Sequence, residues 1–131
     1  MVTKFRENAQ CSRGALRTMI EEETAFIQKC LITAERQRNP SDKCLFLGLA
    51  RETMMHQIEH INALVSLNSM EIIKRENIAG NAFSSWWHKQ VAQSRKEENN
   101  GLEEKRKNVL KELNEVNAQI GILQQNHKKR C

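Results

Sequence analysis

The scarcity of turn-forming residues constrains this chain more than any other feature. Its 131 residues include one Pro, five Gly and no Tyr. Sandwiches and barrels of β-strands need tight turns at short intervals, and these turns draw heavily on Gly and Pro. The composition therefore favours long helices, and 39% hydrophobic residues suffice for a folded core. We expect an all-α fold, with residues 1–131 forming one elongated antiparallel bundle of about four helices.

Apolar residues recur at helical spacing in the first half of the chain, which predicts helices over residues 3–38 and 41–67. Pro40 separates them, because Pro disfavours helical geometry in the residue before it. Asn68-Ser69 is expected to end the second helix and to cap the next one. The spacing assigns to the core Leu16, Ile20, Ile27, Cys30 and Ala34, followed by Leu47, Ala50, Met54, Ile58, Ile61, Leu64 and Val65.

The second half of the chain predicts helices over residues 70–98 and 102–127. The third helix has the weakest apolar pattern, and Gly80-Asn81 and Ser84-Ser85 are poor helix formers in its middle. We therefore expect a kink or break there. Asn99-Asn100-Gly101 is expected to form the turn before the fourth helix, since Gly adopts the positive φ of a helix end readily.

The fourth helix is coiled-coil-like. Its apolar stripe recurs at alternating spacings of three and four residues. The flanking positions are mostly uncharged, and Leu110 and Ile122 broaden the stripe, so packing within a bundle is favoured over a dedicated zipper. The stripe also supplies the candidate anchors for a partner helix, namely Val109, Leu113, Val116, Ile120 and Leu123.

Two adjacent tryptophans, Trp86 and Trp87, lie on the third helix. Large aromatic side chains at helical spacing usually pack inside a protein, so a core location is favoured. The alternative is an exposed surface that stacks on nucleic-acid bases or binds a partner. Because the third helix has the least self-sufficient apolar pattern, both residues are candidate partner-binding residues.

The positive charge is spread thinly. An excess of five positive charges divides into +2 over residues 1–40, −1 over 41–68, +1 over 69–101 and +3 over 102–131. A nucleic-acid-binding protein ordinarily shows a basic stripe on one face, whereas acidic and basic residues are interspersed here. Nucleic-acid binding is therefore an alternative and not the favoured function. Its candidate residues are Lys105, Arg106, Lys107, Lys128, Lys129 and Arg130.

A possible metal site consists of His56, Glu59 and His60, in a sequence that matches the H-x-x-E-H pattern. The three residues fall on the side or back of the apolar stripe of their helix. The two histidines can share a metal, but a third ligand would have to come from a different element or another subunit. A solvated polar face is the simpler interpretation, so a metal-binding bundle is a second alternative. We expect no cofactor.

Glu23 lies in the centre of the first helix's apolar stripe, between Ile20 and Ile27. A carboxylate in that position needs hydrogen-bond donors or a raised pKa. Gln57 is the expected donor, because it falls level with Glu23 on the next helix. A polar layer that fixes helix register is favoured over a binding-site or catalytic carboxylate and over a side chain at the solvent edge.

The four cysteines match no zinc-binding spacing, and we expect reduced thiols. Cys30 and Cys44 would differ in height by roughly 10 Å across their helical hairpin, beyond the ~7 Å limit between bridged Cα atoms. The first residues lack the apolar run of a secretory signal, which leads us to expect an intracellular, cytoplasmic protein.

No catalytic motif stands out: the sequence lacks a recognisable Ser-His-Asp arrangement, a Gly-rich phosphate loop and a paired-carboxylate motif. We therefore expect a non-enzymatic protein–protein interaction module, such as an adaptor, chaperone or assembly subunit. Its partner would be another protein or a second copy of itself. We expect no membrane partner and no small-molecule substrate.

Overall fold

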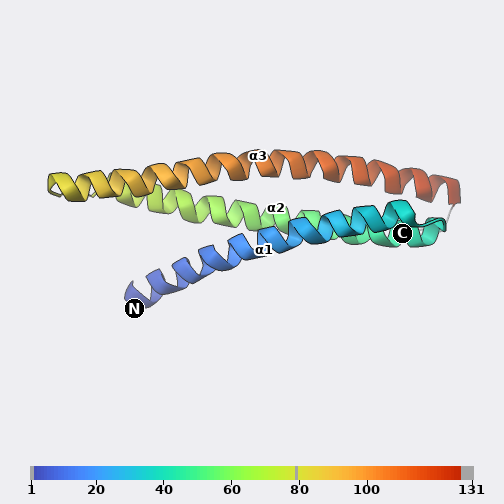
Figure 1. The fold of residues 1–131 in the computed structure, drawn as a ribbon, viewed down its shortest axis with the longest axis horizontal. Coiled ribbons are helices and arrows are strands. Elements are labelled where there is room, and N and C mark those ends of the chain that lie inside the picture. Colours follow the sequence, from blue (N-terminus) through green and yellow to red (C-terminus); the bar gives the residue numbers. More distant parts are fainter. Residues whose placement is uncertain (1, 79, 128–131) are drawn as a thin grey trace.

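The computed structural model describes the backbone of residues 2–78 and 80–127, and the side chains of residues 12–78 and 80–126. These residues form three long helices and no strand: α1 (Val2–Arg36), α2 (Pro40–Glu76) and α3 (Ala82–His127). The molecule is elongated, and in the left-hand part of Figure 1 α2 lies between α1 and α3. α2 packs along both neighbours, whereas no Cα atom of α1 lies within 8 Å of one of α3 in the described part. The all-α prediction is confirmed, but the described helices number three and not four.

The first junction lies where the sequence indicates. Asn39 caps α2 by accepting a hydrogen bond from the backbone N–H of Ser41, at 2.8 Å. Pro40 is the first residue of α2, where its missing N–H costs nothing because that group has no helical partner anyway.

The other two expected boundaries are wrong. α2 runs through Asn68-Ser69 to Glu76, and α3 runs through Asn99-Asn100-Gly101. The chain leaves the helix between Asn77 and Asn81, beside Gly80-Asn81, where the sequence led us to expect a kink or break, while Ser84-Ser85 lies within α3. The side chain of Asn81 accepts a hydrogen bond from the N–H of Ser84 to start α3. Residues 68–69 and 99–101 are poor helix formers, but packing between the helices keeps them helical. Intrinsic helix propensities are small in free energy, and tertiary contacts routinely outweigh them.

Most of the apolar core lies toward the α1–α2 turn, and we call this part the core end. Its largest cluster joins all three helices through the buried side chains Ile27, Cys30, Ala34, Leu47, Ala50, Met54, Val109, Val116 and Ile120. A smaller cluster in the middle of the molecule comprises Ile20, Ile61, Leu64 and Leu102. Helical periodicity thus assigned this core correctly.

The described cysteines have different states. Cys30 is a free, buried thiol, and burial raises its pKa. Cys44 is buried and disulfide-bonded. The prediction that Cys30 and Cys44 do not pair with each other is confirmed, whereas the expectation of a reduced thiol is wrong at Cys44.

Candidate interaction surfaces

The expected anchors on the C-terminal part of α3 lie inside the molecule itself. Val109, Val116 and Ile120 are buried in the core, and Leu113 and Leu123 are partly buried against it. Side chains that already pack against α1 and α2 cannot leave without exposing the core to water. This part of α3 is therefore a structural element, and its predicted role as a partner-binding stripe is not supported.

The tryptophans, which were expected in the core, are exposed instead. Phe83, Trp86 and Trp87 are 73%, 54% and 50% exposed, so the favoured core location is wrong. The rings of Phe83 and Trp86 lie 6.1 Å apart between centroids, in a tilted arrangement. We call these three side chains the aromatic face. Their spacing of i, i+3 and i+4 places them on one side of the first turns of α3.

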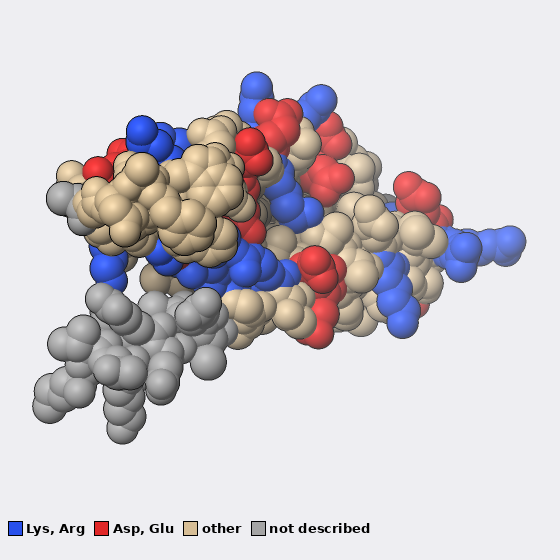
Figure 2. Space-filling model, turned by 60° about the vertical axis from the view of Figure 1, so that its left-hand side comes forward, with Lys and Arg blue, Asp and Glu red and all other residues tan. Residues whose placement is uncertain are grey.

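The aromatic face is exposed because the opposite side of α3 faces the rest of the protein. At this level the buried and partly buried residues of α3 include Ser85, His88 and Ala92. Of these small or polar residues, His88 accepts a hydrogen bond from Arg75 of α2. Figure 2 looks toward this end, where uncharged side chains gather near the α2–α3 turn and Lys and Arg side chains lie along their edge.

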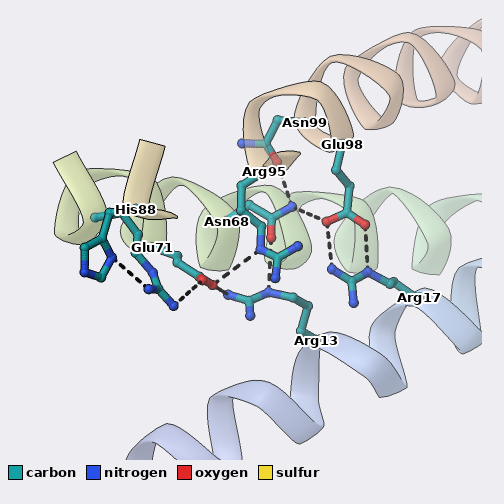
Figure 3. A network of polar contacts seen from close by, with 9 residues as sticks. Arg13, Arg17, Asn68, Glu71, His88, Arg95, Glu98 and Asn99 are labelled. Carbon is teal, nitrogen blue, oxygen red and sulfur yellow. Dashed lines mark hydrogen bonds and ion pairs between the residues drawn. The ribbon is translucent and has the colours of Figure 1, made fainter. Parts of the chain in front are cut away.

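A polar network, in place of an apolar core, joins the helices behind the aromatic face (Figure 3). We call this part the network end. Asn68, fully buried on α2, accepts a hydrogen bond from Nε of Arg13 on α1 at 3.1 Å. Its amide nitrogen donates to Glu98 at 2.7 Å and to Asn99 at 3.0 Å, both on α3. One amide side chain therefore connects three helices.

Glu98 is the second centre of this network. Arg17 of α1 donates to both of its carboxylate oxygens, at 2.7 and 2.9 Å. These hydrogen bonds, supported by that from Asn68, hold the pKa of Glu98 below its usual value, although partial burial opposes the shift. The same contact raises the pKa of Arg17. A two-point pair of this kind fixes orientation as well as charge.

Glu71 extends the network toward the α2–α3 turn. Its carboxylate pairs with Arg13 at 2.6 Å and lies 3.5 Å from both Arg75 and Arg95. Arg75 also donates a hydrogen bond to Nδ1 of His88, at 2.9 Å. Each of these contacts except that between Glu71 and Arg75 joins different helices, so they hold α2 against α1 and against the first part of α3.

The candidate metal residues do not converge. His56 and Glu59 are exposed on the outside of α2, 3.8 Å apart, whereas His60 turns toward α1 and pairs with Glu23 at 2.8 Å. No group of three or more His, Cys, Asp or Glu side chains that could hold a metal ion occurs among the described residues. The three residues are thus divided between solvent and the interface with α1.

The same contact corrects the expectation for Glu23. Its partner is His60, while Gln57 is buried and donates to the backbone oxygen of Ile20 and to Thr24, each at 2.8 Å. Sequence spacing placed Glu23 and Gln57 level with each other but could not decide which side chain each would meet. Gln57 and His60 both bond across the α1–α2 interface.

The candidate nucleic-acid residues lie along the outside of α3 as far as the described residues extend. Lys105 and Arg106 are partly exposed, Lys107 is exposed, and Arg106 donates a hydrogen bond to Asn62 at 2.6 Å. Lys128, Lys129 and Arg130 lie outside the described residues. No continuous basic face is formed by the three that are described.

The chain matches no protein-family model, no curated protein and no solved structure. Within the described residues, no helix combines the length and the apolar character that crossing a lipid bilayer requires.

Proposed function

We propose that this chain is a non-enzymatic protein-interaction module whose contact surface is the aromatic face of α3. The exposure of Phe83, Trp86 and Trp87 carries the proposal. Trp is among the residues most enriched at the energetic centres of interfaces, and exposed apolar patches mark interaction sites. The side chains would bind by insertion into an apolar groove of the partner, the mode that uses helical anchors at i, i+3 and i+4.

The polar network supports this proposal by holding the aromatic face in place. Contacts of Arg13, Asn68, Glu71 and Glu98 order the surrounding backbone before any partner arrives. A preformed surface loses little conformational entropy on binding, so more of the interaction energy is retained as affinity. The chain would thus contribute a rigid helix, and the partner would supply the groove.

Capture from a lysate of the native cell by the immobilised full-length chain tests the proposal. The test variant is Phe83→Ser/Trp86→Ser, which removes two exposed rings without touching the core. Leu110→Ser/Ile122→Ser is the matched control, because it removes two exposed apolar side chains from another part of α3. Circular dichroism verifies that both variants keep the helical content of the wild type.

We expect at least one protein to bind the wild type and the control at similar levels and to lose most of its binding to Phe83→Ser/Trp86→Ser. A captured set that is the same for all three chains contradicts the proposal. The wild-type chain could instead retain nucleic acid that nuclease digests and higher salt releases. That result would assign the aromatic face to base stacking.

A further inference from the structure

A groove runs along the core end between α1 and α3. The backbones of α1 and α3 both lie close to α2, whereas no Cα atom of α1 lies within 8 Å of one of α3 in the described part, and the groove follows this separation. Two hollows of 220 and 410 Å³ lie along it, one nearer each end. Apolar side chains of all three helices line the first hollow, including Leu31, Leu47 and Val116. Ile27 and Val109 line the second.

The rim of this groove is acidic, although the whole chain carries a net charge of +5. Glu35, Glu104, Glu112 and Glu115 line the two hollows, against Lys43 and Lys105. No hydrogen bond or ion pair joins any of the four carboxylates to another described residue. The groove thus combines an apolar floor with carboxylates that are free to pair with an incoming cation.

The aromatic face has the complementary composition. Residues 82–96, which contain it, include Lys89, Arg95 and Lys96 and no acidic residue. Arg95 and Lys96 pair with carboxylates of α2, which leaves Lys89 on the surface without an ion-pair partner among the described residues. Lys74, exposed on the last turns of α2, adds a second unpaired cation at this end.

We propose that a second copy of this chain is a partner of the aromatic face, which docks in the groove between α1 and α3 of that copy. The inference rests on the function proposed above and names the partner. Binding within one molecule is excluded by geometry, because Trp87 and Gly101, where the groove begins, are 14 residues apart on one continuous helix, or roughly 20 Å. The contact joins two different surfaces, so successive copies either close into a ring or continue as an open chain.

Two variants that block the two surfaces separately give the sharpest test. Phe83→Ser/Trp86→Ser blocks the aromatic face, and Glu112→Lys/Glu115→Lys reverses the charge of the groove rim. All four side chains are exposed, so the helical fold is expected to persist, and circular dichroism confirms it. Sedimentation velocity gives the mass of each chain over a range of concentrations, and non-reducing electrophoresis identifies any disulfide-linked species.

We expect wild-type assemblies that grow with protein concentration and shrink as salt screens the exposed charges. Each blocked variant alone stays monomeric. An equimolar mixture forms a complex of twice the monomer mass, because one variant keeps its face and the other keeps its groove. Glu52→Lys/Glu59→Lys, with the same charge change on exposed residues of α2, associates like the wild type.

Three results would overturn the inference: a wild type that is monomeric at every concentration, a blocked variant that still associates with itself, or an equimolar mixture that contains only monomers. A monomeric wild type that still captures another protein through Phe83 and Trp86 would remove the second copy as the partner. In that case the function proposed for the aromatic face would stand.

Discussion

The two ends of the molecule are built on different interactions. At the core end, the helices meet over buried apolar side chains such as Met54 and Ile120. At the network end, Asn68 and Glu98 join the same three helices by hydrogen bonds and an ion pair, and the aromatic side chains face solvent. Apolar burial stabilises the fold of the first end, whereas directional polar contacts position a surface at the second. A helix can therefore belong to the core along one part of its length and present exposed aromatic side chains along another.

Truncation of the apolar core should have the largest effect. Met54→Ala removes a fully buried side chain from the core end and should lower the free energy of unfolding by about 2–5 kcal/mol. Met55→Ala is the matched control, because the neighbouring side chain is exposed and should change stability by less than about 0.5 kcal/mol. Urea denaturation followed by circular dichroism measures both. Equal effects would contradict the packing described for α2.

Removal of the central amide of the network should cost less. Asn68→Ala leaves the buried guanidinium of Arg13 without one acceptor and should destabilise the protein by about 1–3 kcal/mol. Asn62→Ala is the control, because Asn62 accepts its hydrogen bond from Arg106 at an exposed position. If the two variants unfold at the same urea concentration, Asn68 does not connect the three helices as described.

The ion pair of Glu98 should make the network end sensitive to acid. Because the folded-state pKa of Glu98 lies below its unfolded value of 4.5, its stabilisation is fully present above that value. The stabilisation is lost as the pH falls from there through the lower, folded-state pKa. Glu98→Gln should lower stability at neutral pH and reduce its loss on acidification, while Glu97→Gln, next to it and exposed, should retain the wild-type profile. Urea titrations at a series of pH values compare the three chains.

Gly101 lies where a turn was expected and none forms, whereas Gly80 lies where a break was expected and the chain leaves the helix. Gly101 lies inside α3, and a Cβ atom there would meet nothing within 4 Å, so Gly101→Ala should stabilise the protein by about 1 kcal/mol. Gly80 lies in the actual turn, where a Cβ atom would approach Oγ of Ser84 to 2.9 Å, so Gly80→Ala should give no such gain. Thermal unfolding compares the two. A loss of stability in Gly101→Ala would indicate a turn at 99–101.

The sequence predicts the core end well and the network end poorly, for one physical reason. Helical periodicity of apolar residues is local information, and it correctly assigned buried positions such as Ile27, Met54 and Ile120. The partners of a buried polar side chain are not local: Arg13 reaches Asn68, 55 residues away, and Glu98 bonds to Arg17, 81 residues away. Asn68 therefore resembles a helix cap in the sequence, although its side chain is a junction between three helices.

The aromatic face was also mispredicted because local spacing does not show what the neighbouring helices present. Trp86 and Trp87 have the helical spacing of core residues, and only the small and polar composition of the opposite face, with Ser85, His88 and Ala92, indicates otherwise. That signal is present in the sequence. It becomes decisive only when the neighbouring helices are known to present Arg13 and Arg75 at this level.

Tryptophan fluorescence of the folded protein tests the exposure of the aromatic face most directly. The chain contains two Trp and no Tyr, so its emission reports on Trp86 and Trp87 alone. In the monomeric variant Glu112→Lys/Glu115→Lys, we expect emission typical of indole in water and quenching by acrylamide that changes little when urea unfolds the chain. Blue-shifted emission that is protected from acrylamide, and becomes accessible only on unfolding, would place the tryptophans in a core and contradict the aromatic face as a binding surface.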